Sequence, residues 1–231
     1  MNNFFGNLPV VTKNLLVLNI LFFIASWLLP GIIDHLAVFY PDSPNFKVWQ
    51  LVTYMFMHWG IGHIFFNMFA LVMFGATIER ILGPKRFLNY YLICGFGALM
   101  MQYGIQAIEV HQLTGSIRPL HELGDNVINQ LSESDFRSLY EIYGTPLVGA
   151  SGAIYGLLLA FGYLFPNAEL MLIFFPVPVK AKYFIPILIV IEVYLGFSQS
   201  GSSIAHLAHV GGALFGFILL KLWKIRRTNY H

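Results

Sequence analysis

Four polar side chains that are suited to acyl-transfer chemistry interrupt the apolar stretches of this 231-residue chain. Ser151 and His209 lie in two different stretches, and His63 and Asn67 lie four residues apart in a third, on one face if that stretch is helical. A serine hydroxyl becomes a useful nucleophile when a base removes its proton, and histidine is the usual base near neutral pH. The side chains of His63 and Asn67, with the Ser151 N–H, could donate hydrogen bonds to an oxyanion.

No acidic side chain is expected to complete this group. Glu79 lies at the end of its apolar stretch, and Glu192 lies in the middle of another. We therefore expect a Ser151–His209 dyad, whose imidazole is held by something other than a carboxylate. Tyr155 follows Ser151 by about one helical turn and could stack on the imidazole. The role of Glu192 stays open.

His206 is an alternative base, because it precedes His209 by three residues and could share a helix face with it. Only His209 has glycines three and seven residues later, namely Gly212 and Gly216. These glycines favour His209, and the role of His206 stays open.

The composition places the chain in lipid. Hydrophobic residues make up 57% and charged residues only 10%, whereas a soluble domain carries charge on roughly a quarter of its residues. The net charge of +2 and the scattered basic residues give no reason to expect nucleic acid as a partner. The single cysteine, Cys94, excludes an internal disulfide and a cysteine-based metal cluster. No metal and no cofactor is expected.

Six apolar segments are predicted to cross a hydrocarbon core of about 30 Å. They run from Leu15 to Leu29, Ile64 to Ile78, Phe87 to Ile108, Leu147 to Phe165, Tyr183 to Phe197 and Ile204 to Leu220. Residues 1–13 lack the pattern of a cleaved signal, so the first helix is expected to stay in the mature protein. The expected fold is an all-α membrane protein with one six-helix domain over residues 1–231.

The basic residues predict the orientation of these spans. Ten of the 13 Lys and Arg residues fall on one side, in Lys13, Arg80, Lys85, Arg86, Lys180, Lys182, Lys221, Lys224, Arg226 and Arg227. The other three are Lys47, Arg118 and Arg137. The positive-inside rule then places both termini in the cytoplasm. Of the two long outer segments, residues 30–62 are expected to lie in the membrane interface, and residues 109–146 form a polar insertion, expected as a solvated loop with one or two short helices.

The candidate catalytic side chains are predicted to share one depth. Counting from the cytoplasmic helix ends at about 1.5 Å per residue places Ser151 and His209 at roughly 21 Å and Asn67 at roughly 18 Å. Stripes of small residues border the serine and the histidine, and such stripes let helices approach closely in lipid. The stripes are Gly152, Gly156 and Ala160, and Ala208, Gly212 and Gly216.

The fourth span is expected to become helical only at Ser151, because residues 144–150 contain glycine and proline. Non-helical backbone at membrane depth must be buried in protein or line a water-filled cavity. We therefore expect a water-accessible pocket with Ser151 at its floor, open to the extracytoplasmic side.

Together these motifs resemble the rhomboid intramembrane serine proteases. The resemblance rests on G-x-S-G with a following tyrosine (Gly149, Ser151, Gly152, Tyr155), on H-x-x-x-N (His63, Asn67), on A-H-x-x-G-x-x-x-G (Ala208, His209, Gly212, Gly216) and on Glu79-Arg80. It implies hydrolysis of peptide bonds in transmembrane segments of single-span membrane proteins, within a bilayer that we expect to be a bacterial inner (plasma) membrane. Ser151 would be the nucleophile, His209 the base, and His63 and Asn67 donors to the oxyanion. One departure is Gln50, which follows Trp49 where the family often has arginine.

Two other functions fit parts of the pattern. A catalytically inactive rhomboid relative would bind membrane clients, but retention of both Ser151 and His209 argues against it. A small ion or proton transporter could also place polar groups in the membrane. Against transport, the polar groups are confined to the outer third of the spans and no inverted repeat is present.

Overall fold

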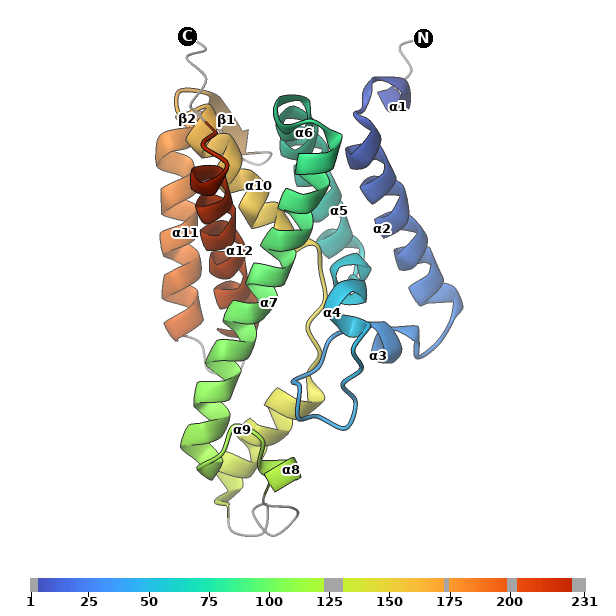
Figure 1. Ribbon diagram of the computed structural model, residues 1–231, viewed down its shortest axis with the longest axis vertical. Coiled ribbons are helices and arrows are strands. Elements are labelled where there is room, and N and C mark those ends of the chain that lie inside the picture. Colours follow the sequence, from blue (N-terminus) through green and yellow to red (C-terminus); the bar gives the residue numbers. More distant parts are fainter. Residues whose placement is uncertain (1–3, 123–130, 173–174, 199–202, 226–231) are drawn as a thin grey trace.

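The computed structural model describes residues 4–122, 131–172, 175–198 and 203–225, which form a helical bundle (Figure 1). The bundle helices are α2 (Val10–Leu28), α5 (Ile61–Ala70) with the π-helical turn η2 (Leu71–Gly75) and α6 (Ala76–Leu82), α7 (Pro84–Thr114), α10 (Ser151–Leu164), α11 (Ala181–Ser198) and α12 (Ser203–Leu222). The shorter elements are α1 (Phe4–Asn7), α3 (Ile32–Leu36), α4 (Gln50–Thr53), the 3₁₀ turn η1 (Tyr54–Phe56), α8 (Pro119–Glu122), α9 (Glu133–Gly144), β1 (Glu169–Leu172) and β2 (Phe175–Lys180).

Each of the six predicted spans contains a helix. Four helical stretches are long and apolar enough to cross a membrane, namely Val10–Leu28, Ile61–Leu82, Pro84–Thr114 and Ala181–Ser198. Two further apolar helices accompany them, namely the shorter α10 (Ser151–Leu164) and α12, which is apolar over its part from His206 to Leu222. The chain is thus a mostly helical membrane protein.

The expectation of an all-α chain is wrong between α10 and α11. Here β1 and β2 pair as an antiparallel hairpin, with Glu169 opposite Lys180 and Leu170 opposite Val179. The pairing satisfies backbone N–H and C=O groups that a plain connection would leave to water.

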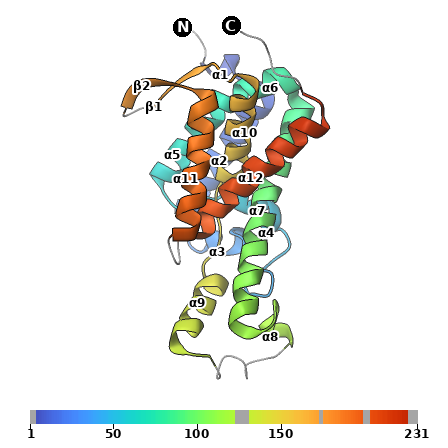
Figure 2. The ribbon, with the colours of Figure 1, turned by 90° about the vertical axis from the view of Figure 1, so that its left-hand side faces the viewer.

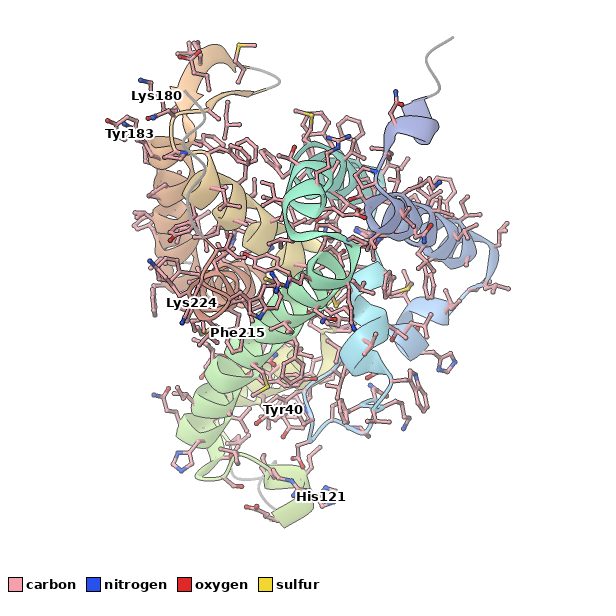
Figure 3. All side chains as sticks on the ribbon, turned by 45° about the horizontal axis from the view of Figure 1, so that its top comes forward. Tyr40, His121, Lys180, Tyr183, Phe215 and Lys224 are labelled. Atoms are coloured by element: carbon pink, nitrogen blue, oxygen red, sulfur yellow. The ribbon has the colours of Figure 1, made fainter. Side chains whose placement is uncertain are left out.

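Helix α10 is the centre of the bundle and packs against α5, α6, α7, α11 and α12. Its small and aliphatic side chains are buried over most of its length. Helix α12 lies across α7 and α10, and its Phe215 lies beside α7 (Figure 3), where it fills the space above Gly97. The two helices that carry Ser151 and His209 are therefore in direct contact.

The two ends of the bundle differ in what covers them. The start of α2, the end of α6, the hairpin and the end of α12 gather at one end, whereas α3, α8 and α9 lie at the other (Figures 1 and 2). Helix α7 extends past the rest of the bundle at this second end (Figure 2). Tyr40 and His121 are found here and Lys180 at the opposite end (Figure 3).

The described part of residues 109–146 contains short helices with mostly exposed side chains, as expected, but one face of α9 is buried and not solvated. Tyr143 of α9 and Val110 of α7 are buried in an apolar cluster with Tyr40 of the first outer segment. Asp42 accepts hydrogen bonds from the Tyr143 hydroxyl (2.8 Å) and the Leu120 N–H (2.9 Å). Residues 123–130 of this segment lie outside the described residues.

Gln50 anchors the first outer segment. Its amide donates to the carbonyls of His35 (3.3 Å) and Asn45 (3.1 Å), and its side-chain oxygen accepts from the Lys47 N–H (2.9 Å). Gln50 is fully buried, whereas Trp49 beside it is half exposed. The segment thus combines a polar anchor with an exposed aromatic ring, which is the composition expected at a membrane interface.

Candidate active site

Ser151 and His209 meet where α10 begins. The Ser151 hydroxyl oxygen lies 2.8 Å from Nε2 of His209 on α12. Both residues are partly exposed. This is the geometry in which an imidazole can take the hydroxyl proton, and it joins two residues that are 58 positions apart in the chain.

The small-residue stripes bring these two side chains together, as predicted. A Cβ atom added at Gly212 would lie 1.9 Å from the Gly152 carbonyl oxygen, so the backbones of α10 and α12 are in contact. One turn further, a Cβ at Gly216 would lie 3.2 Å from the Gly156 Cα. Close backbone approach of this kind is what small residues permit in membrane helices.

The backbone before Ser151 is held by the first outer segment. Leu147 pairs with Val38 as an isolated β-bridge, and the Gly149 N–H donates to the Tyr54 carbonyl at 2.9 Å. The predicted late start of the helix at Ser151 is therefore confirmed, and protein groups accept the hydrogen bonds that the missing helical turn would have made.

His63 of α5 lies against Gly149. A Cβ added at Gly149 would lie 2.9 Å from the His63 Nε2 and 3.4 Å from the Ser151 hydroxyl oxygen. Gly149 also has a φ of +128°, which disfavours any other residue. The predicted oxyanion donor His63 thus lies beside the nucleophile, next to the space that a side chain at position 149 would fill.

Asn67 is buried one turn further along α5. Its amide nitrogen donates to the His63 carbonyl at 2.9 Å, so the described hydrogen bond stays within the helix. Behind His63, the buried ring of His58 packs edge-on at a centroid distance of 4.9 Å. Asn67 therefore supports the turn that carries His63.

The predicted stack of Tyr155 on His209 is present. The ring centroids are 4.3 Å apart and the rings are within 5° of parallel. Stacking on one face restricts rotation of the imidazole and directs Nε2 to the serine.

The expectation that no carboxylate reaches the histidine is wrong. Glu192 of α11 places Oε2 3.0 Å from the Nδ1 of His209 and 2.7 Å from the Nδ1 of His206. Its other oxygen, Oε1, accepts a hydrogen bond from the Tyr155 hydroxyl. His206, the alternative base, thus contacts the carboxylate, while His209 contacts both the carboxylate and Ser151.

The sequence does not predict the contact between Glu192 and His209, because depths counted along each helix can be compared only if the helices are parallel. Counted in the same way from Tyr183, Glu192 lies about 14 Å from the cytoplasmic end of its helix, whereas His209 lies about 21 Å from the end of its own. Helix α12 is strongly inclined to α11 (Figure 2), so equal counts along the two helices do not correspond to equal depths. One available signal is that an acidic residue in an apolar helix should face protein and not lipid.

A metal ion could in principle be held by Glu192, His206 and His209, since one ligand atom from each lies within 4.8 Å of the others. Two ligands of one tetrahedral zinc ion are about 3.3 Å apart, given bonds of about 2.0–2.1 Å. The 2.7 Å contact between Glu192 and His206 is shorter and fits a direct hydrogen bond.

The known proteins that resemble this chain carry rhomboid names. The model of the rhomboid domain matches residues 45–224. The chain is 31% identical over 190 residues to RHOMBOID-like protein 12, mitochondrial, of Arabidopsis thaliana, which covers 80% of this chain and 50% of that protein. It is 30% identical over 169 residues to rhomboid protease GluP of Bacillus subtilis, and the match covers 73% of this chain and 25% of that protein. It is 26% identical over 226 residues to the presenilin-associated rhomboid-like protein, mitochondrial, of Bos taurus, and the match covers 90% of this chain and 51% of that protein.

These relatives bear on compartment and length as well as on family. Two of the three carry mitochondrial names, so the expected bacterial plasma membrane is not supported. The chain spans about half, or less, of the length of the relatives it matches. The domain match covers most of the chain, from the first outer segment to the end of α12, and includes every residue of the site. The chain belongs to the rhomboid family.

Proposed function

We propose that this chain is an intramembrane serine endopeptidase that cleaves transmembrane segments of single-span membrane proteins. The observation that carries the proposal is the 2.8 Å contact between the Ser151 hydroxyl and the His209 Nε2 in a membrane protein of the rhomboid family. A chain that only bound clients would have no use for an aligned nucleophile and base.

The residues fit a two-step acyl transfer. Ser151 Oγ bonds to the scissile carbonyl carbon while its proton moves to the Nε2 of His209. The C–N bond then breaks as His209 gives that proton to the leaving amine. Water, deprotonated by His209, hydrolyses the acyl ester and regenerates Ser151.

The oxyanion has donors on two sides of Ser151. The Ser151 N–H belongs to the first turn of α10, where N–H groups have no acceptor within the helix and the dipole is positive. His63 lies beyond Gly149, close to the serine hydroxyl. We propose that these two groups donate hydrogen bonds to the negative charge that develops on the substrate carbonyl oxygen. Asn67 is a further donor or supports His63.

For the membrane topology we propose six spans in one domain, with both termini cytoplasmic and the site opening away from the cytoplasm. The distribution of ten basic residues against three supports this orientation. Helix α10, with 14 residues, is the shortest of these spans, and the first outer segment covers its beginning.

Purified protein in detergent should cleave a fluorescent single-span reporter and react with a fluorophosphonate. Ser151→Ala and His209→Ala should each abolish cleavage, and Ser151→Ala should also abolish labelling. Ser26→Ala on α2 and His35→Ala at an exposed position are matched controls that should cleave normally. Normal cleavage by Ser151→Ala would disprove the proposal.

A further inference from the structure

We infer that Glu192 is the positioning carboxylate of the site, so that the base works as part of a Ser151–His209–Glu192 triad and not as a dyad. The inference rests on the proposed function, because a carboxylate behind the histidine matters only if the histidine acts as a base.

The placement of Glu192 on α11 is the first observation. This helix lies at the periphery and exposes large apolar side chains such as Val190 and Tyr194, which are 66% and 70% exposed. Its buried residues are Ala181, Ile185, Glu192 and Gly196. The acidic side chain is therefore on the narrow face that contacts the bundle, where an unpaired charge would be costly.

The second observation is that both carboxylate oxygens have donors. Oε2 lies between the Nδ1 atoms of His206 (2.7 Å) and His209 (3.0 Å), and Oε1 accepts from Tyr155. Three elements, α10, α11 and α12, thus meet at one carboxylate. The Glu192 side chain is only 9% exposed, so these contacts are largely shielded from water.

These contacts determine the tautomer of His209. An ionised carboxylate can only accept hydrogen bonds, so the Nδ1 of His209 carries the hydrogen. In the neutral ring Nε2 then has a free lone pair, and this lone pair faces the Ser151 hydroxyl at 2.8 Å. This is the tautomer that a general base requires.

The carboxylate also stabilises the state that follows proton transfer. When His209 has taken the serine proton the ring is cationic, and the negative charge of Glu192 lies beside its Nδ1–H. Such a pair is stronger in a low-dielectric site than in water. Glu192 stays ionised throughout and takes no proton in the reaction. His206 and Tyr155 hold the carboxylate in place.

The test compares Glu192→Gln with the unchanged protein. The amide has the same shape but only one accepting oxygen for three donors, so it cannot hold the required tautomer as the carboxylate does. We expect kcat and the rate of fluorophosphonate labelling to fall about 100-fold or more, with KM changed by less than about threefold. A purely structural role would lower the melting temperature and leave the labelling rate of the folded protein unchanged, and that result would overturn the inference.

Glu79→Gln is the matched control, since Glu79 is also a buried carboxylate with several hydrogen bonds but lies on α6, where it binds the start of α2. It should lose thermal stability and keep the labelling rate. Treatment with EDTA should leave the activity of the unchanged protein intact. Loss of activity that zinc restores would instead make the cluster a metal site and overturn the inference.

A spectroscopic measurement on the unchanged protein makes the test independent of the folding of any variant. The ¹⁵N signals of the His209 ring, identified by their loss in His209→Gln, should report a hydrogen on Nδ1, and a hydrogen on Nε2 alone would refute the triad. If Ser151→Ala still cleaves, the proposed function itself fails. If Ser151→Ala is inactive but Glu192→Gln labels at the normal rate, only the role of Glu192 fails.

Discussion

Gly149 holds the backbone before Ser151 in a conformation that other residues rarely adopt, with a φ of +128°. In Gly149→Ala the new methyl group would also lie 2.9 Å from the His63 Nε2. We expect this variant to fold and to lose at least about tenfold in kcat/KM, because shifts of the order of 1 Å at a reacting centre are costly. Cleavage of the single-span reporter measures the effect. Gly62→Ala is the control, because a methyl group there has open space and the activity should not change.

Tyr155 makes two separable contributions to the position of His209. Tyr155→Phe keeps the stacked ring but loses the hydrogen bond to Glu192, whereas Tyr155→Leu loses both. An aromatic stack is worth about 0.5–1.5 kcal/mol, so kcat should be roughly 2- to 10-fold lower in Tyr155→Leu than in Tyr155→Phe. Steady-state kinetics on the same reporter measure the ratio. Equal kcat values in the two variants would show that the stack does not orient the base.

Residue types and spacing were enough to predict the pair Ser151 and His209 and the stack of Tyr155, because these follow from helical periodicity and from the small-residue stripes. Glu192 could not be assigned in the same way. Its contacts depend on the rotation of α11 and on the inclination of α12, and neither is encoded in a count of residues along one helix. A single buried acid on a lipid-facing helix was the available clue.

The contact between α10 and α12 depends on Gly212. In Gly212→Ala the methyl group would overlap the Gly152 carbonyl oxygen, and backbone cannot move away as a side-chain end can. We expect a loss of about 1–3 kcal/mol or more in the free energy of unfolding. The same variant should lose activity, because separation of the helices moves His209 from Ser151. Thermal unfolding in detergent and reporter cleavage measure the two effects.

Gly104→Ala on α7 is the matched control for this element. A methyl group there meets nothing within 4 Å, and alanine favours the helix by about 1 kcal/mol relative to glycine. It should therefore be neutral or stabilising, with normal activity. If Gly212→Ala behaved in the same way, the close approach of α10 and α12 would be contradicted.

Glu79 fastens the start of α2 to the end of α6. Its carboxylate accepts from the N–H groups of Val11 (2.9 Å) and Thr12 (2.7 Å) and from the Thr12 hydroxyl (2.7 Å). The first N–H groups of a helix have no internal acceptor, and a negative charge there is favourable. Glu79→Gln should cost about 1–3 kcal/mol and speed hydrogen exchange at Val11 and Thr12. Glu133→Gln, at an exposed position of α9, should change neither quantity.

The β1–β2 hairpin is an element that the sequence does not predict. Residues 169–180 carry prolines at positions 176 and 178, and proline within an apolar run argues against a strand. The pairing is also irregular between Leu170 and Leu172. The four long helices, by contrast, follow directly from the apolar length that crossing a bilayer requires.

At the scale of the whole molecule, the outer insertion and the first outer segment form one unit beyond the bundle. Asp42, whose side chain is fully buried, receives hydrogen bonds from Tyr143 and Leu120, and Arg118 and His121 lie within ion-pair distance of its other oxygen. The charge and polarity of residues 109–146 predict a solvated loop with short helices. Asp42 of the first outer segment, which binds Leu120 and Tyr143, lies about 80 to 100 positions earlier in the chain. Local periodicity does not reveal contacts over such a separation.

Tyr40 and Tyr143 of this unit remain hydrogen-bond donors at ordinary pH. Burial, with a further contribution from Asp42, raises the pKa of Tyr40 to about 12, and the same two causes raise the pKa of Tyr143 further above its usual value. The Tyr40 hydroxyl donates to the Ile117 carbonyl at 2.7 Å. The unit should therefore stay docked at neutral pH, with Asp42 as its central acceptor.

Asp42→Asn tests whether this unit folds separately from the site in the bundle. The amide keeps one accepting oxygen but loses the charge that faces Arg118 and His121, so α8 and α9 should detach more often. We expect limited proteolysis to cut residues 115–144 at least about tenfold faster, which corresponds to a loss of about 1.4 kcal/mol in docking free energy. Labelling of Ser151 by the fluorophosphonate should keep its rate, because α10 and α12 hold the pair without the insertion. If labelling falls as far as docking does, the insertion supports the site directly and the two are one cooperative unit.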